Sequence, residues 1–79
     1  MNIKATTLPP IMVWRTSQGC VAWCDELNEL GYGDSVEDCI ADLCQTLVGL
    51  YEIMREEQDI LSPELSKIWE CLQRAVEET

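Results

Sequence analysis

Apolar residues from position 36 to position 54 recur at alternating steps of four and three, the spacing that places side chains on one side of an α-helix. Ser35 is a favourable N-cap residue, and Asp38 stands where the carboxylate of a capping box reaches back. A long helix with one apolar side needs another element to cover that side. The apolar stripe consists of Val36, Ile40, Leu43, Leu47, Leu50 and Met54, flanked by Cys39, Cys44 and Tyr51.

Three short runs before this helix predict the sheet that it covers. Residues 11–16 follow the helix-breaking Leu8-Pro9-Pro10 and are rich in strand formers, and residues 17–19 supply a turn. Residues 20–24 form the second strand, and residues 29–33, interrupted by glycine, form a weaker third strand. Alternation along the second strand puts Val21 and Trp23 on one face and Cys20, Ala22 and Cys24 on the other.

The remaining residues predict a polar linker and a second helix. The linker covers residues 55–59, after which Ser62 serves as N-cap with Pro63 at the first helical position. The second helix is predicted over residues 62–78, with Leu65, Ile68, Trp69, Leu72 and Val76 on its apolar side. We therefore predict one α+β domain over residues 1–79. It comprises a three-stranded antiparallel sheet packed by one long helix and followed by a C-terminal amphipathic helix.

The charge of the chain restricts its partners. Its 79 residues include 15 acids and 5 bases, a net charge of -10, and all the acids lie after Cys24. Such a field repels phosphate backbones and anionic lipid and attracts cations. We expect a basic protein as partner, with no direct nucleic acid and no membrane.

Several classes of chemistry have no support in the sequence. The chain contains no His, so the usual general base near neutral pH and the imidazole metal ligands are absent. The five Cys show no metal-ligand spacing, and the first residues lack the pattern of a secretory signal. We predict no enzyme activity, no catalytic residues, no cofactor and no metal, and reduced cysteines in a cytoplasmic protein.

Two groups of residues are candidates for partner binding. The outer side of the long helix is predicted to carry an acidic stripe formed by Asp38, Asp42, Glu52 and Glu56. Trp14 and Trp23 lie on neighbouring strands of a sheet whose second face no predicted helix covers, so an interface role is an alternative to a core role. Two amphipathic helices together with these tryptophans exceed what one small core can enclose, so we expect a homodimer or a higher homo-oligomer.

Several motifs resemble a known family. They are Ala22-Trp23-Cys24-Asp25-Glu26-Leu27, Gly33-Asp34-Ser35, and Asp38-Cys39 with Leu43. Over residues 11–54 this pattern resembles the HicB-type antitoxin domain, in which a strand ends in Ala-aromatic-Cys-Pro-Glu-Leu and a Gly-Asp-Thr/Ser turn opens a helix of the form Glu-Ala-x-x-x-Leu. Asp25 replaces the usual proline, and Cys39 replaces the usual alanine.

The resemblance implies a partial ribonuclease-H-like fold of three strands and a helix. It also implies a non-catalytic, antitoxin-like module that binds and occludes a small, basic, RNA-cleaving toxin and that associates with itself. Family members commonly add a DNA-binding segment, whereas residues 62–78 contain only Lys67 and Arg74 as bases. Two alternatives remain open: a phage-type acidic inhibitor that mimics nucleic acid and blocks a nuclease or CRISPR complex (anti-CRISPR), and a structural or assembly subunit.

Overall fold

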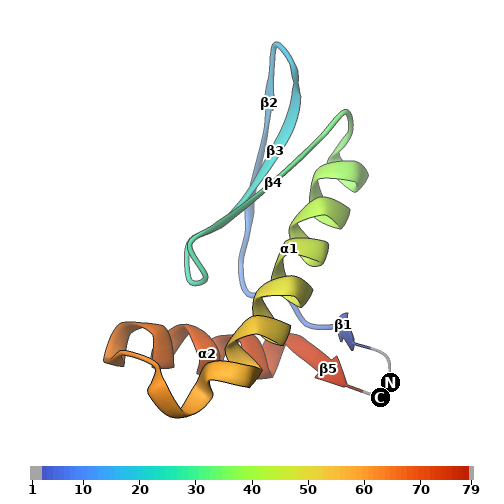
Figure 1. Ribbon diagram of the computed structural model, residues 1–79. Helices are drawn as coiled ribbons and strands as arrows, with labels where there is room; N and C mark the ends of the chain where they lie inside the picture. Colours follow the sequence, from blue (N-terminus) through green and yellow to red (C-terminus); the bar gives the residue numbers. More distant parts are fainter. Residues whose placement is uncertain (1–2, 79) are drawn as a thin grey trace.

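The computed structural model describes residues 3–78 and contains a three-stranded sheet, a two-stranded sheet and two α-helices (Figure 1). The three-stranded sheet is antiparallel in the order β2-β3-β4, and helix α1 packs on one of its faces, with α2 following. The predicted fold class is confirmed. The strands of this sheet are β2 (Met12–Thr16), β3 (Gly19–Cys24) and β4 (Glu29–Gly33), and the helices are α1 (Val36–Glu57) and α2 (Pro63–Ala75).

The predicted hairpin forms with a two-residue turn between β2 and β3. Thr16 lies opposite Gly19, and the Oγ1 atom of Thr16 accepts a hydrogen bond from the backbone N–H of Gln18 at 3.1 Å. Gly19 has a φ of +141°, a conformation that other residues rarely adopt. A Cβ atom at this position would also collide with the carbonyl oxygen of Gly33, so the hairpin requires glycine here.

Helix α1 begins where the sequence predicts. The Oγ atom of Ser35 accepts a hydrogen bond from the backbone N–H of Asp38 at 3.1 Å, which satisfies one of the free donors of the first turn. The helix ends later than predicted, at Glu57, and a 3-10 turn (Gln58–Ile60) follows it. The prediction of a linker over residues 55–59 was therefore wrong in its first half, because polar residues such as Arg55 and Glu56 extend a helix as readily as they form a loop.

Strand β4 approaches α1 more closely than a side chain would allow. A Cβ atom on Gly31 would meet the backbone of Cys39 and Leu43, and one on Gly33 would meet Asp38. The two glycines, which made this strand look weak in the sequence, are thus the residues that let sheet and helix pack backbone to backbone.

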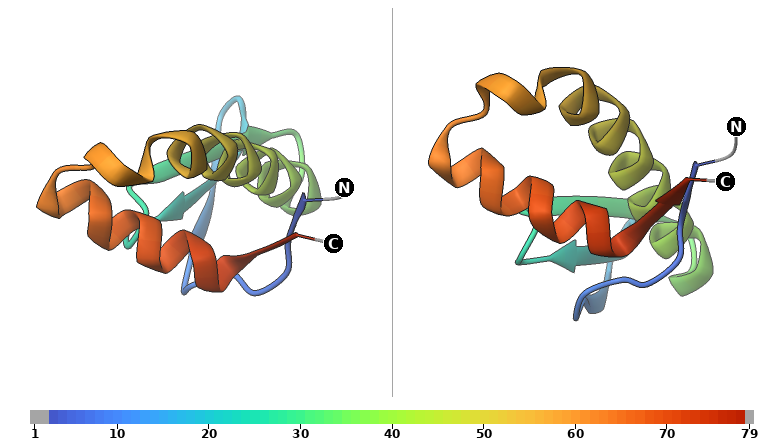
Figure 2. Two further views of the ribbon diagram at one scale, coloured as in Figure 1. Left: turned by 60° about the horizontal axis from the view of Figure 1, so that its bottom comes forward. Right: turned by 90° about the horizontal axis from the view of Figure 1, so that it is seen from below.

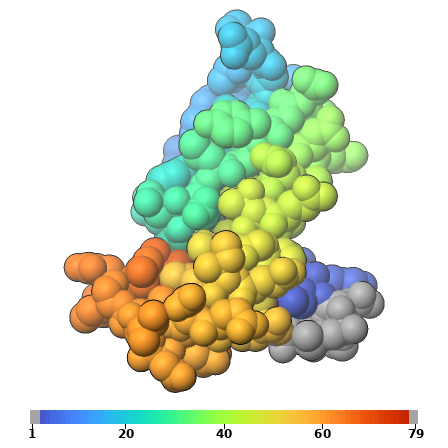
Figure 3. All heavy atoms as spheres, viewed as in Figure 1, coloured from blue at the N-terminus to red at the C-terminus, as the bar shows by residue number. Residues whose placement is uncertain are grey.

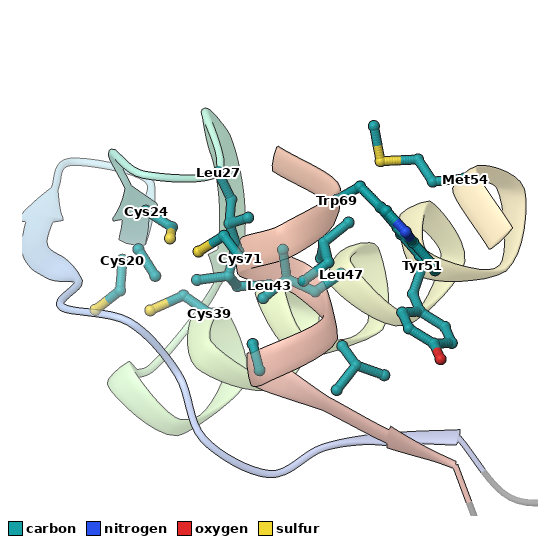
Figure 4. Close-up of a cluster of buried hydrophobic side chains, with 14 residues drawn as sticks. Cys20, Cys24, Leu27, Cys39, Leu43, Leu47, Tyr51, Met54, Trp69 and Cys71 are labelled. Atoms are coloured by element: carbon teal, nitrogen blue, oxygen red, sulfur yellow. The ribbon is translucent and has the colours of Figure 1, made fainter. Parts of the chain in front are cut away.

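The core is continuous but has two chemically different ends (Figure 4). Between the sheet and α1 lie the sulfur atoms of Cys20, Cys24, Cys39 and Cys71, as Figure 4 shows at its left. Between α1 and α2 the rings of Tyr51 and Trp69 pack with centroids 5.1 Å apart. Alternation along β3 is confirmed, because Cys20, Ala22 and Cys24 belong to this core. Trp69 is a core residue, as its place on α2 predicts.

The C-terminal helix is shorter than the predicted 62–78. Ser62 caps it as predicted, with its Oγ atom accepting from the backbone N–H of Leu65 at 3.3 Å. It ends at Ala75, whose carbonyl oxygen accepts hydrogen bonds from the backbone N–H groups of Thr6 and Thr7 at 2.8 and 3.2 Å. The chain then becomes extended as β5 (Val76–Glu78).

Strand β5 pairs antiparallel with β1 (Ile3–Ala5), and neither strand is predicted from the sequence. Both views of Figure 2 show the two strands side by side. Val76 is buried as expected, but from a strand and not from a helix. Val36 and Leu65, expected on the apolar sides of the helices, are exposed, and each lies in the first turn of its helix.

Candidate functional site

The face of the three-stranded sheet that points away from α1 carries six apolar residues in register. They form two cross-strand rows, because Val21 and Trp23 of β3 each have an apolar neighbour on both sides. We call this surface the open face. Its rows are Met12, Trp23 and Leu30, and Trp14, Val21 and Tyr32.

No helix within residues 3–78 covers the open face. In Figure 1 α1 lies to the right of the sheet and α2 lies below it. The exposed fractions of the outer side chains are 65% for Met12, 62% for Tyr32 and 43% for Trp14, whereas Val21 in the centre of its row is buried. The chain exposes 5285 Å² in total, compared with about 4900 Å² for a compact monomer of this mass.

Both tryptophans predicted as partner-binding residues lie on this face. Trp14 comes from the edge strand β2, and half-buried Trp23 comes from the central strand, one row away. Met12, Leu30 and Tyr32 were not predicted as site residues. Positions 12 and 14, like positions 30 and 32, lie two apart and therefore on the same face of a strand. With the strand register known, this spacing would have identified the three residues as neighbours of the tryptophans.

The four acidic residues predicted as a stripe share one side of α1, but they differ in exposure. Asp38, Glu52 and Glu56 are exposed, and helical spacing places them on one side of α1 together with Asp42. Asp42, however, is half-buried, and its Oδ2 atom accepts a hydrogen bond from the backbone N–H of Tyr32 at 2.9 Å. One of the four carboxylates is therefore occupied in joining α1 to β4.

Acidic residues also border the open face along the chain. Asp25 and Glu26 lie in the turn that connects β3 to β4, and Asp34 directly follows β4. All three are exposed. An apolar surface with acids at both ends of its strands suits a partner surface with an apolar centre and basic surroundings.

The five cysteines are free thiols, and four of them are buried. The Sγ atom of Cys71 donates a hydrogen bond to the Oε2 atom of Glu26 at 3.2 Å. Burial raises the pKa of the Cys71 thiol, and the bond to Glu26 raises it further; burial likewise raises the pKa of Cys24 and of Cys44. Raised pKa values keep these thiols protonated and weakly nucleophilic.

In the part of the chain that the structure describes, no cluster of three or more His, Cys, Asp or Glu side chains could hold a metal ion. Neither of the helices between residues 3 and 78 has the length and apolar content needed to cross a membrane.

Comparison of the chain with protein-family models, with curated proteins and with solved structures found no match.

Proposed function

We propose that this chain is a non-catalytic protein-binding module that holds a basic protein on the open face of its sheet. The observation that carries the proposal is the pair of uncovered apolar rows, which bring Trp14 and Trp23 to one surface with four further apolar residues. Aromatic residues at the centre of an apolar surface are the typical anchors of protein interfaces.

The charge supports a basic partner. The net charge of -10 accelerates encounter with cationic proteins and repels nucleic acid, and Asp25, Glu26 and Asp34 lie where they would meet basic residues around a docked partner. Association should therefore be fast at low salt and slower as salt screens the charges. Affinity at equilibrium should depend mainly on the apolar rows.

We propose further that the module is HicB-like and antitoxin-like. Three strands followed by a long helix is the arrangement that the resemblance implies, and Gly33-Asp34-Ser35 opens α1 in the manner of the family motif. The proposed partner is then a small RNA-cleaving toxin, which this chain binds and occludes in the cytoplasm. No operator binding is proposed, because α2 contains only Lys67 and Arg74 as bases.

The proposal is tested with two matched variants. Tyr32→Glu places a charge in the open face, whereas Ile53→Glu places the same charge at an equally exposed position on α1, where the exposed fraction is 64%. Proteins captured from the native host by the immobilised parent are identified, and their affinity for parent and variants is measured by titration. Tyr32→Glu should weaken binding by more than tenfold, and Ile53→Glu should leave it unchanged. If the parent and Tyr32→Glu bind the partner equally well, the open face is excluded as the binding surface.

A second candidate function is an acidic inhibitor that mimics nucleic acid, and the exposed carboxylates of α1 favour it. Asp38 and Glu56 are separated by about 27 Å along one side of the helix, and no base lies between Glu37 and Met54. If this function is the correct one, Glu52→Lys with Glu56→Lys should abolish binding to a nuclease or CRISPR complex, and Tyr32→Glu should not.

A further inference from the structure

Strand β2 has a free hydrogen-bonding edge. It is the outermost strand of its sheet and pairs on one side only, with β3. All five of its residues are exposed, and none is proline, lysine or an acid. Natural sheets usually protect an edge of this kind with such residues or cover it with another element. In Figure 3 the tip of the β2–β3 hairpin forms the upper end of the molecule, away from α2.

The opposite edge of the same sheet is closed. The backbone N–H of Tyr32 on β4 donates to the carboxylate of Asp42 at 2.9 Å. Gly31 and Gly33 hold the backbone of β4 directly against α1. The sheet can therefore be extended by another strand at β2 and not at β4.

The charge near β2 selects the strand that could pair with it. Residues 11–24 contain no acid and one base, Arg15, although the whole chain carries a net charge of -10. Two copies of this chain can thus approach through β2 with less repulsion than through either helix. A strongly basic or strongly acidic strand would meet no row of opposite charges on β2.

We propose that β2 pairs antiparallel with β2 of a second copy, about a two-fold axis perpendicular to the sheet. Any register that sets a residue of β2 opposite its own equivalent keeps the side chains on matching faces. Of these we choose the two centred on apolar residues near the middle of the strand, with Trp14 opposite Trp14 of the second copy or Val13 opposite Val13 of the second copy. Both registers place apolar side chains across the axis and keep the two Arg15 residues from facing each other directly. The result is one six-stranded sheet with both α1 helices on one side and both open faces joined on the other.

The joined faces would bring together twelve apolar residues where one copy has six, with Val21 of each copy buried beneath the others. Pairing of a five-residue strand buries little area, so the dimer should be weak, with a dissociation constant on the order of 10 µM or more. The pairing and the proposed function can fail separately, because the pairing uses the backbone edge of β2 and the proposed function uses the open face, although Trp14 of the open face lies at the axis in one of the two registers.

Sedimentation equilibrium tests this pairing in the full chain. The parent, of 9.0 kDa, should approach twice that mass as its concentration rises to about 1 mM. Val13→Lys should raise the dissociation constant by more than tenfold, because it places two positive charges opposite each other. In the Trp14 register the new lysine faces Arg15 of the second copy, and in the Val13 register it faces the new lysine of the second copy. Val13 lies outside the core cluster, so the variant should keep its fold, which circular dichroism checks.

Tyr32→Glu is the matched control and should dimerise like the parent, because β4 is two strands away from the pairing edge. A parent that stays monomeric at about 1 mM would overturn the proposal. If Tyr32→Glu is monomeric while Val13→Lys is still dimeric, the edge pairing is wrong. That result would instead indicate a dimer in which two sheets stack through their open faces. Hydrogen exchange gives a second readout on the unmodified chain: protection of the amides of β2 should increase with protein concentration, and unchanged protection would also contradict edge pairing.

Discussion

The carboxylate of Asp42 accepts a hydrogen bond from the backbone N–H of Tyr32 at 2.9 Å and so connects the second turn of helix α1 to the outer edge of strand β4. Asp42, which the sequence predicts to be part of a solvated acidic stripe, therefore has a structural role. The bond satisfies a main-chain donor that has no strand partner, and it fixes the strand that carries Leu30 and Tyr32 of the open face.

Replacing Asp42 by alanine should lower the free energy of unfolding by about 1 kcal/mol, because one hydrogen bond is lost and the N–H of Tyr32 is left to solvent. Asp42→Asn keeps an acceptor oxygen and should recover most of this loss. Urea unfolding of the three proteins provides the measurement. Equal stability of Asp42→Ala and the parent would mean that the bond contributes nothing.

Charge reversal should affect the two halves of the acidic stripe differently. Glu52→Lys with Glu56→Lys should leave stability within about 0.5 kcal/mol of the parent, because both side chains are exposed and repel each other at a spacing of four. Asp38→Lys with Asp42→Lys should be less stable, since it removes the acceptor of Tyr32. Thermal unfolding of the two double variants compares them, and equal melting temperatures would contradict this division.

Gly31→Ala should destabilise the protein by about 3 kcal/mol, because the added Cβ atom would meet the backbone of Cys39 and Leu43 and would force β4 away from α1. Gly49 is the control. It lies within α1, and a Cβ atom there would have nothing within 4 Å, so Gly49→Ala should stabilise the helix by roughly 0.5 to 1 kcal/mol. Opposite shifts of the urea midpoint are expected, and two shifts of the same sign would show that the close approach is not required.

Trp69→Ala should cost about 3 to 5 kcal/mol, because it removes the ring that packs on Tyr51 and opens the core between the helices. Leu65→Ala, at an exposed position of the same helix, should cost about 0.5 kcal/mol. Unfolding followed by tryptophan fluorescence and by circular dichroism measures both. A small effect of Trp69→Ala would mean that α2 is held mainly by other contacts.

Stability should fall at alkaline pH because of the buried thiols. Burial raises the pKa of Cys24, Cys44 and Cys71 in the folded chain. The unfolded chain therefore loses these protons first, at about pH 8.5. The contribution to stability is complete below that pH and is lost as the pH rises through the folded pKa values. Urea unfolding between about pH 7 and pH 10.5 should show the decline, and Cys44→Ala should reduce it; a decline of equal size in this variant would exclude a contribution from Cys44.

Elements that depend on neighbouring residues were predictable. The hairpin follows from the turn after Thr16, and Ser35 and Ser62 mark the helix starts through bonds that reach three residues ahead. The alternation of Cys20 and Val21 on β3 likewise follows from strand geometry alone. Each of these features involves only residues close together in the chain, so the sequence pattern contains the relevant information.

Features that depend on distant residues were not predictable. Val76 continues the helical spacing of Leu72, yet it lies in a strand, because Thr6 and Thr7 occupy the carbonyl oxygen of Ala75 and β1 offers a pairing partner. The bond from Tyr32 to Asp42 joins residues on different elements in the same way. The open face was predicted only through its two tryptophans, since the other members depend on the register of three strands.

The pairing of β1 with β5 also bears on the order in which the protein is assembled. Ile3 lies opposite Glu78, and closing a loop of about 75 residues costs far more entropy than closing the hairpin. We therefore expect the hairpin and α1 to form first and this pairing to form last. Ile3 and Ala5 line a surface of α1 together with Cys44 and Val48. During synthesis β1 has no strand partner until residues 76–78 have left the ribosome, so we expect the segment that covers this side of the helix to be most exposed to aggregation and proteolysis just before β5 appears.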